Sequence, residues 1–358
     1  MRNIMWLAVL PTPFINFLLQ HLKRDQDLAI KVYYSNKSWN GFPWKTQYTD
    51  DDDNFFDRRA GVDWSLVAAA FRDRDSLFLV TGWNNLTNLL ILAIRGFRKL
   101  PFAIWTDTVK VDTSIKYVIK RLILSNLLKN AAAILTTGEV GIASIKESGC
   151  FPKDVPIVNF PFWIPLPQFA GERVVDPEGV IRFLCAGRLV PRKGYDLVIQ
   201  AFRSCLDRGY KNIRLQIAGT GSEESNLRAQ VEQYGLRDYV KFLGWLEADA
   251  MQAVRMNNDV FIHCVPVHDP FPVAVLEAMA AGLPVIGSSK AGSVVERVKS
   301  GVSGFVINPD SLEELVEAMV FFARQPNMAV LMGRNARSIA EQWPVERGVD
   351  LIKSVAKR

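Results

Sequence analysis

Cysteine and histidine are scarce in this chain of 358 residues, which contains four cysteines and three histidines. The cysteines stand far apart, at positions 150, 185, 205 and 264, and no C-x-x-C pair occurs. This spacing excludes a disulfide framework and a zinc ribbon, and thiols this sparse are typical of proteins in a reducing cytosol. The few histidines argue against a histidine-rich metal site.

Long hydrophobic runs are absent as well. No stretch reaches the roughly 18–20 uninterrupted apolar residues that a membrane span needs. The start of the chain, Arg2 followed by IMWLAVL, is similar to a signal peptide, but Pro11 closes the run and no small-residue cleavage site follows. We interpret the run as a first buried strand and expect a cytoplasmic protein.

The excess of basic over acidic residues is small. Forty-three basic and 37 acidic residues give a net charge of +6, and most of the excess lies in residues 1–170. Such a bias suits anionic lipid headgroups, nucleic acid or phosphorylated ligands, without choosing among them. Because no basic stripe is interleaved with aromatic residues, we expect no nucleic-acid partner.

Apolar residues make up 49% of the chain, enough for two sizeable cores. Short apolar runs alternate with longer periodic segments, a pattern typical of right-handed βαβ units on a parallel sheet. Prolines and glycines cluster at 161–180, which we interpret as a linker. The sequence therefore predicts two doubly wound α/β domains, residues 1–165 and 166–344, which bind ligands at the carboxyl ends of their strands.

The stretch AGRLVPRKGYDLVIQAF, residues 186–202, places two cations beside a predicted helix start. Arg188 and Lys193 are five residues apart and are flanked by Gly187 and Gly194. Two cations next to the free amides of a helix N-terminus can bind a diphosphate. The alternative is a solvated basic loop.

The stretch HDPFPVAVLEAMAAGLPVIGS, residues 268–288, holds two carboxylates eight residues apart. Asp269 lies in a predicted loop, where it can face a sugar. Glu277 lies on the helix predicted to start near Val273, where it can accept hydrogen bonds from ribose hydroxyls. The free amides of Val273 and Ala274 can hold phosphate oxygens. The alternative role of Asp269 is to cap this helix.

Three further motifs occur in order with these two: IAGTG at 217–221, FLGWL at 242–246 and KAGSVVE at 290–296. Together the motifs resemble the retaining GT-B glycosyltransferases of group 1, the family 4-like enzymes of bacterial cell-surface polysaccharide and lipopolysaccharide-core synthesis. The resemblance is specific over 183–310 and weaker over 1–160. It implies two Rossmann-like domains across a donor-binding cleft, the N-terminal one binding the acceptor and the C-terminal one the nucleotide sugar. It also implies that the last helix, 345–358, packs back on the first domain.

By this resemblance, the protein is a hexosyltransferase that moves a sugar from a nucleotide-sugar donor, a UDP-sugar by preference, to a glycan or lipid-linked acceptor with retention of configuration. Asp269 contacts the transferred sugar and Glu277 binds the ribose. The diphosphate is held by Arg188, Lys193, Val273 and Ala274. Further donor contacts are implied at Phe271 and Pro272 for the sugar and at Gly219, Gly221, Trp245 and Leu246 for the nucleobase and its loop. No cofactor or essential metal is implied, because the cations and the helix dipole offset the charge of the departing diphosphate.

Three departures from the family pattern stand out. Asp269 is one methylene shorter than the usual glutamate, and Pro272 replaces a common glycine and has no N–H to donate. The first domain has PTPF at 11–14 instead of a glycine-rich loop, and WTDT stands where a histidine is often found. Asp107 or Thr106 is then the candidate to face the donor sugar or acceptor, with an N-cap as the alternative role of Asp107.

The helix predicted over 114–130 bears on the acceptor. Its apolar stripe consists of Ile115, Ile119, Leu122, Ile123, Leu127 and Leu128, and its cations are Lys116, Lys120, Arg121 and Lys129. A helix packed on the core explains the stripe; the alternative is a basic amphipathic helix on the anionic inner face of the cytoplasmic membrane. The aromatic residues Trp39, Phe42 and Trp44 can add a contact for sugar or lipid.

Two other functions are compatible with the same sequence. A nucleotide-sugar-binding subunit without turnover would explain the changes at Asp269 and Pro272, although the retained Arg188, Lys193 and Glu277 argue against complete loss of function. A nucleotide-sugar epimerase shares the fold. A glycoside phosphorylase would need a pyridoxal-phosphate lysine site, for which the sequence gives no candidate.

Overall fold

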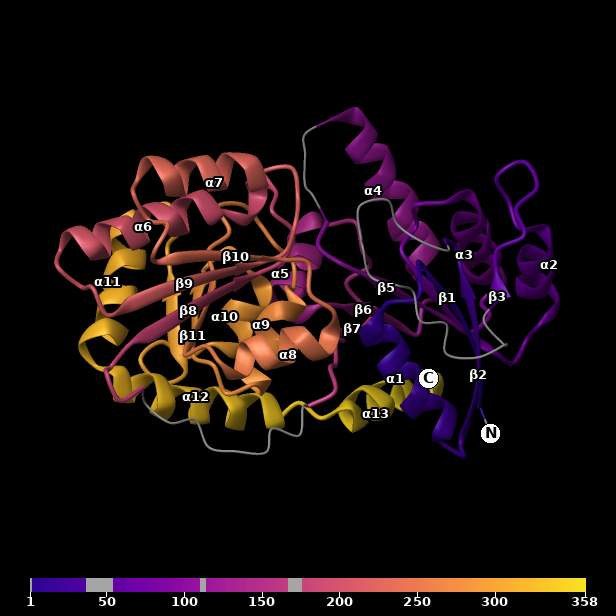
Figure 1. Ribbon diagram of the computed structural model, residues 1–358. Coiled ribbons are helices and arrows are strands. Elements are labelled where there is room, and N and C mark those ends of the chain that lie inside the picture. Colours follow the sequence, from indigo (N-terminus) through magenta and orange to yellow (C-terminus); the bar gives the residue numbers. More distant parts are fainter. Residues whose placement is uncertain (1, 37–53, 110–113, 167–175) are drawn as a thin grey trace. The chain divides into compact units, whose positions relative to one another are not determined.

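The computed structural model describes residues 2–36, 54–109, 114–166 and 176–358. The chain divides into two compact units, the first formed by Met1–Pro165 and Pro344–Arg358 and the second by Leu166–Trp343. Each unit is built on a sheet of parallel strands with helices on both faces (Figure 1). No helix in the described part of the chain has the length and apolar character needed to cross a bilayer.

Unit 1 contains a seven-stranded parallel sheet in the order β3-β2-β1-β4-β5-β6-β7. Its strands are β1 (Arg2–Ala8), β2 (Leu28–Tyr34), β3 (Asn54–Phe55), β4 (Leu77–Thr81), β5 (Phe102–Thr106), β6 (Ala133–Thr136) and β7 (Ile157–Asn159). Its helices are α1 (Pro13–Arg24), α2 (Trp64–Arg72), α3 (Leu86–Arg98), α4 (Ile115–Leu128), α5 (Gly138–Ser148) and α13 (Val345–Ala356). The strand order reverses between β1 and β4, where Ile4 pairs with Leu77.

The core of unit 1 has one layer on each face of this sheet. Successive strand residues point to opposite faces, so Trp6 and Leu7 enter different layers. The layer around Trp6 is closed by α1 and α13, which lie side by side (Figure 1). Lys353 on α13 reinforces this contact: its Nζ lies 3.0 Å from Oδ2 of Asp25 and 2.7 Å from Oδ2 of Asp27. The layer around Leu7 is covered by α2, α3, α4 and α5.

The start of the predicted linker belongs to the core of unit 1. Trp163 is only 3% exposed, and its ring packs against Phe160 with centroids 4.7 Å apart. A Cβ added at Gly348 on α13 would lie 3.0 Å from the Trp163 ring, so the helix and the indole are in close contact. The prolines of 161–180 signal irregular backbone, and the boundary between the two units, after Pro165, lies within this stretch. Irregular backbone can still be buried, as Trp163 shows.

Unit 2 contains a six-stranded parallel sheet in the order β10-β9-β8-β11-β12-β13. Its strands are β8 (Ile181–Ala186), β9 (Ile213–Ala218), β10 (Val240–Gly244), β11 (Val260–His263), β12 (Val285–Ser288) and β13 (Gly304–Ile307). Its helices are the 3-10 turn η1 (Pro191–Lys193), α6 (Tyr195–Asp207), α7 (Glu224–Gln233), α8 (Ala248–Met256), α9 (Val273–Ala280), α10 (Gly292–Arg297), α11 (Leu312–Arg324) and α12 (Pro326–Glu341). The strand order reverses between β8 and β11, where Phe183 pairs with Val260.

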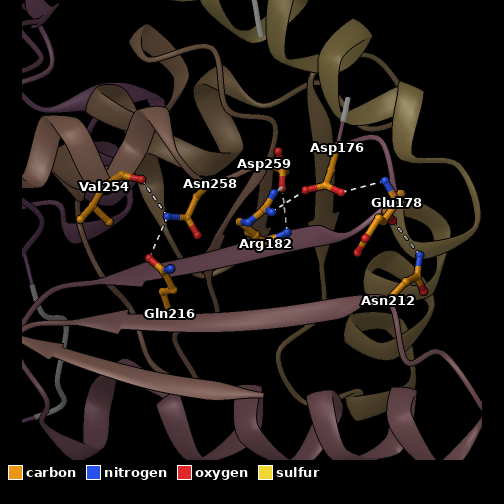
Figure 2. Close-up of polar contacts among 9 residues, drawn as sticks. Asp176, Glu178, Arg182, Asn212, Gln216, Val254, Asn258 and Asp259 are labelled. Atoms are coloured by element: carbon orange, nitrogen blue, oxygen red, sulfur yellow. Dashed lines mark hydrogen bonds and ion pairs between the residues drawn. The ribbon is translucent and has the colours of Figure 1, made fainter. Parts of the chain in front are cut away.

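A polar cluster fixes the amino ends of β8 and β11 (Figure 2). One guanidinium nitrogen of Arg182, Nη2, lies 2.5 Å from Oδ2 of Asp176, and the other, Nη1, lies 3.6 Å from Oδ2 of Asp259. Beside it, the Asn258 side chain donates to Oε1 of Gln216 at 3.0 Å. The cluster ties the segment that enters unit 2 to its sheet and leaves the opposite, carboxyl edge of the strands for binding.

Candidate functional site

The predicted donor residues of unit 2 gather where its strand order reverses. Lys193 ends η1, the turn that follows β8. His263 is the last residue of β11, and Asp269 follows it in the loop before α9. In open α/β sheets the carboxyl ends of the strands at such a reversal form the usual ligand site. The topology therefore places the three side chains in the expected position for ligand binding.

Lys193 and Asp269 form a direct ion pair. Nζ of Lys193 lies 2.5 Å from Oδ2 of Asp269, and only 14% and 11% of the two side chains are exposed. Arg192 is more exposed and stands 3.8 Å from the other carboxylate oxygen. The alternative of a solvated basic loop is therefore wrong for Lys193, because the residue predicted to bind phosphate is held by the residue predicted to contact the sugar.

His263 completes this cluster and was not predicted. Its Nε2 lies 3.2 Å from Oδ2 of Asp269, and the residue is 6% exposed. An ionised carboxylate can only accept hydrogen bonds, so the imidazole carries its proton on Nε2 in this contact. The sequence gives little indication of this role, because a single histidine at the end of an apolar strand cannot be distinguished from an ordinary core residue.

The electrostatics of the cluster favour an ionised Asp269. Burial alone would raise the pKa of this carboxyl, but the hydrogen bond from His263 and the charge of Lys193 outweigh it and hold the pKa well below its usual value. Burial lowers the pKa of Lys193, and Asp269 offsets only part of that effect. Burial also lowers the pKa of His263. At neutral pH the cluster thus contains a carboxylate and a neutral imidazole.

The backbone of Asp269 is held as firmly as its side chain. Its N–H donates to the carbonyl of Lys290 at 3.0 Å, and its carbonyl accepts from the N–H of Gly292 at 3.0 Å. Pro272, rather than Asp269, occupies the N-cap position of α9, and no side chain caps this helix. The alternative role of Asp269 as an N-cap is therefore wrong.

The start of α9 offers free backbone donors. The first amides of a helix have no intrahelical partner; here that of Val275 turns back to the carbonyl of Pro272 at 3.2 Å. Val273 and Ala274, the predicted phosphate ligands, are the first two residues of this helix and are half-buried. The positive end of the helix dipole thus lies two residues after the buried Phe271 and close in sequence to Asp269.

Glu277 lies one turn further along α9 and is paired. Its carboxylate forms a short ion pair with Arg255 on α8. The Glu277 side chain is 37% exposed, which leaves part of the carboxylate open to a ligand. Withdrawal from water raises its pKa, and the Arg255 charge opposes this. Arg255 was not predicted, since nothing in the sequence indicates that α8 would supply a cation to α9.

Gly219 and Gly221 allow the backbone of the loop after β9 to approach the backbone of the loop after β8. Gly219 has φ +132°, and a Cβ there would lie 1.9 Å from the carbonyl oxygen of Gly187. A Cβ at Gly221 would lie 2.2 Å from that of Leu189. The loop after β9 is thereby locked onto the loop after β8, which carries the half-buried Arg188. This packing accounts for both glycines whether or not they approach a nucleotide.

The other predicted donor contacts divide into buried and exposed residues. Phe271 is 4% exposed, and its ring centre is 5.9 Å from the guanidinium of Arg297, so its side chain belongs to the core. Pro272 is buried and its carbonyl accepts from the Ser293 hydroxyl at 2.9 Å. Trp245 is 38% exposed just beyond β10, and Leu246 beside it is half-buried.

Asp107 belongs to unit 1 and follows β5, one strand beyond the reversal between β1 and β4. Its carboxylate accepts a short hydrogen bond from the hydroxyl of Thr137, the N-cap residue of α5. The following helix, α4, is capped instead by Ser114, whose side chain accepts from the N–H of Tyr117. The N-cap alternative for Asp107 is therefore wrong. Thr106, its neighbour, ends β5.

The helix predicted over 114–130 is α4, and its apolar stripe is only partly in the core. Leu128 is fully buried, whereas Ile115 and Leu122 are 72% and 62% exposed. The interpretation of the whole stripe as core packing was wrong, because α4 is apolar on two faces and the sheet can bury only one. The predicted aromatic contact at Trp39, Phe42 and Trp44 lies outside the described residues.

The sequence of residues 172–339 matches the family described as Glycosyl transferases group 1. The match covers nearly all of unit 2, including Lys193, Asp269 and Glu277. This part of the chain belongs to the group 1 glycosyltransferases. The resemblance predicted from the order of the motifs is thus confirmed.

Relatives of this group 1 domain carry different names. The chain is 26% identical over 205 residues to the protein named "Putative colanic acid biosynthesis glycosyltransferase WcaL" of Salmonella typhimurium, with 55% of this chain and 49% of WcaL covered. It is 31% identical over 169 residues to the GDP-mannose-dependent alpha-(1-6)-phosphatidylinositol monomannoside mannosyltransferase of Mycobacterium tuberculosis, with 45% of this chain and 43% of that protein covered. The chain spans less than half the length of these relatives.

The fold of the whole chain, beyond the group 1 domain, is also found in solved structures. HepE of Anabaena in complex with UDP matches with a TM-score of 0.74 and 18% identity, and the match covers 100% of both chains. At this identity the likeness shows the fold alone. The two doubly wound α/β sheets predicted from the sequence are therefore confirmed as the GT-B fold.

Proposed function

We propose that this protein transfers a sugar from a nucleotide-sugar donor, a UDP-sugar by preference, to a glycan or lipid-linked acceptor in cell-envelope polysaccharide synthesis. The observation that carries the proposal is the cluster of Lys193, Asp269 and the start of α9 at the strand reversal of a group 1 glycosyltransferase domain. It brings a cation, an ionised carboxylate and free helix amides together at the carboxyl edge of one sheet.

The donor diphosphate is assigned to Lys193, Arg188 and the amides of Val273 and Ala274. An ammonium group has three N–H donors, and Asp269 occupies one of those of Lys193, so two are left for phosphate oxygens. The positive end of α9 adds to this field. UDP is the preferred nucleotide because the GT-B structure of HepE holds UDP, whereas a relative named for GDP-mannose makes GDP the first competitor.

The ribose is assigned to Glu277. Its pairing with Arg255 fixes the carboxylate on α9, and its exposed portion can accept hydrogen bonds from two vicinal hydroxyls. Such charge-assisted bonds contribute about 1.5–3 kcal/mol each. Trp245, exposed beyond β10, is the proposed contact of the nucleobase together with Leu246 and the glycine loop at Gly219 and Gly221.

The reaction is proposed to retain the anomeric configuration of a hexose. The departing diphosphate takes the acceptor proton, while the carboxylate of Asp269 stabilises positive charge at the anomeric carbon. The sugar itself lies at the Phe271-Pro272 backbone. Because Lys193, Arg188 and the helix dipole balance the leaving group, no essential metal is required. In unit 1, Asp107, held by Thr137, is the proposed contact to sugar or acceptor.

The proposed location is the cytoplasm, at the inner face of the cytoplasmic membrane when the acceptor is lipid-linked. All four cysteines are free and buried, which fits a reducing compartment.

The deciding experiment is a thermal-shift panel with UDP, GDP, ADP, CMP and dTDP and their sugar conjugates, followed by mass spectrometry of acceptor glycans incubated with the preferred donor. A ligand that binds only the native state raises the melting temperature as ln(1 + [L]/Kd). We expect one nucleotide to raise the melting temperature of the unchanged chain but not that of Arg188→Ala or Lys193→Ala. No shift with any nucleotide would contradict the proposal.

The same experiments distinguish the proposed function from the two alternatives. A rise in melting temperature without sugar transfer to any acceptor would identify a binding subunit without turnover. Conversion of the donor sugar to its epimer, detected by NMR without transfer, would identify a nucleotide-sugar epimerase.

A further inference from the structure

An exposed apolar stripe runs along α4 in unit 1. Its members are spaced at the i, i+3, i+4, i+7 and i+8 positions that share one helix face: Ile115, Val118, Ile119, Leu122 and Ile123, each between 46% and 72% exposed. The opposite face of the helix is already in the core, through Tyr117, Leu124 and Leu128. We call these five exposed residues the α4 stripe. The core of unit 1 therefore does not account for it.

Exposed apolar side chains are concentrated around the α4 stripe. Among the described residues, nine of the fifteen exposed large apolar side chains lie on α2, α3 and α4, the neighbouring helices of one layer. Helix α3 approaches α4 closely, since a Cβ at Gly96 would lie 2.4 Å from the carbonyl oxygen of Leu127. The next residue, Phe97, is 81% exposed. A concentration of exposed apolar side chains of this kind is typical of an interaction site.

The charge of α4 identifies the kind of partner. Within Ile115–Leu128 there are three cations, Lys116, Lys120 and Arg121, and no Asp or Glu, and Lys129 follows at the C-cap. An apolar stripe on a helix whose charges are all positive has the chemistry of an interfacial helix on an anionic lipid surface. A contact between two copies of this chain would bring like charges together.

We propose that the α4 stripe is a membrane-docking surface, which inserts into the headgroup region of an anionic bilayer while cations of the same helix meet lipid phosphates. The inference deepens the location proposed above and rests on it, but it is independent of the donor site. Its apolar contribution comes from the five stripe residues, and its charge contribution makes binding depend on lipid composition and on salt.

The test is sedimentation of the full chain with sucrose-loaded vesicles of phosphatidylcholine alone or mixed with phosphatidylglycerol. We expect binding to the anionic vesicles that weakens as salt rises from about 0.05 to about 0.5 M. Ile119→Glu with Leu122→Glu should weaken binding at least about tenfold, since burying either side chain is worth that much. Arg121→Gln with Lys129→Gln should weaken it by on the order of fivefold per charge.

Leu331→Glu is the matched control, because Leu331 is a 51% exposed helix residue in unit 2; it should bind vesicles as the unchanged chain does. All variants should keep their melting temperature by circular dichroism, since the substituted side chains are exposed. The proposal is overturned if the unchanged chain does not sediment with anionic vesicles at low salt, or if the Ile119→Glu, Leu122→Glu chain binds equally well. It is also overturned if these substitutions instead abolish a lipid-free oligomer, which would make the stripe a contact between copies. A nucleotide-induced rise in melting temperature without vesicle binding would remove this inference and the proposed membrane location, and would leave the proposed sugar transfer intact.

Discussion

Lys193 and Asp269 are 76 residues apart in sequence, and the ammonium of the first lies 2.5 Å from the carboxylate of the second. The pair connects the loop after β8 with the loop after β11, the two strands between which the order of the sheet reverses. Donor phosphate and transferred sugar would thus meet side chains that already restrain each other. Under the proposed function, rearrangement of either loop would therefore disturb both the diphosphate and the sugar of the donor.

Replacing only one partner of this ion pair should destabilise the protein more than replacing both. We expect Asp269→Asn or Lys193→Met alone to lower the free energy of unfolding by roughly 3 kcal/mol, because each leaves a largely buried group without its partner. The double variant should be less destabilised than the sum of the two, with a coupling of about 1–3 kcal/mol. Urea unfolding of the four chains measures the cycle; strictly additive losses would contradict the pairing.

The ion pair should also make stability depend on pH at the acid end. Because the folded pKa of Asp269 lies below its unfolded value, the carboxylate stabilises the native state above the unfolded pKa, and this contribution is lost as pH falls through and below that value. The difference in unfolding free energy between the unchanged chain and the Lys193→Met, Asp269→Asn chain should therefore shrink from pH 7 toward pH 3. A constant difference over this range would argue against an ionised Asp269.

His263 should act as a positioning residue for Asp269. His263→Phe removes the hydrogen bond to the carboxylate, so the pKa of Asp269 should rise and the acid limb of the pH–activity profile should move upward. His263→Gln, which can still donate, should restore most of the unchanged profile. If both variants lose activity equally with no shift of the limb, the role of His263 is packing alone.

Glu277 and Arg255 should affect nucleotide binding to different degrees. Glu277→Gln removes the charge from the proposed ribose contact and should weaken nucleotide binding about 10–100-fold, read as a smaller thermal shift. Arg255→Met leaves the carboxylate but releases its orientation, and should weaken binding less. A nucleotide-induced rise in melting temperature that is the same in Glu277→Gln as in the unchanged chain would show that Glu277 does not contact the ribose.

Gly219 should be far less tolerant of alanine than a matched surface glycine. Gly219→Ala combines φ +132° with a Cβ 1.9 Å from the Gly187 carbonyl oxygen, and we expect a loss of at least about 3 kcal/mol. Gly235 also has positive φ, but nothing lies within 4 Å of its added Cβ. Gly235→Ala should therefore cost only about 1–2 kcal/mol. Similar unfolding curves for the two variants would contradict the close packing of the loops.

Local patterns in the sequence were sufficient to predict the architecture. Buried parallel strands are continuous apolar runs, and β8, β9 and β13 stand out in the sequence as IRFLCA, IRLQIA and GFVI. The start of helix α12 is not visible in this way, because it follows α11 after the single residue Gln325 and a periodic pattern does not mark so short a break. The two-residue strand β3 is too short to show any periodicity.

The sequence by itself determined which residues are chemically able to hold a nucleotide sugar, because glycines, cations and carboxylates at fixed spacing are local features. Only the tertiary structure decided what each is paired with: Lys193 with Asp269, His263 with the same carboxylate, and Arg255 with Glu277. It also decided which face of α4 is buried. Partners of this kind come from distant strands and helices, and burial depends on what the rest of the chain covers, so neither is encoded in spacing along the chain.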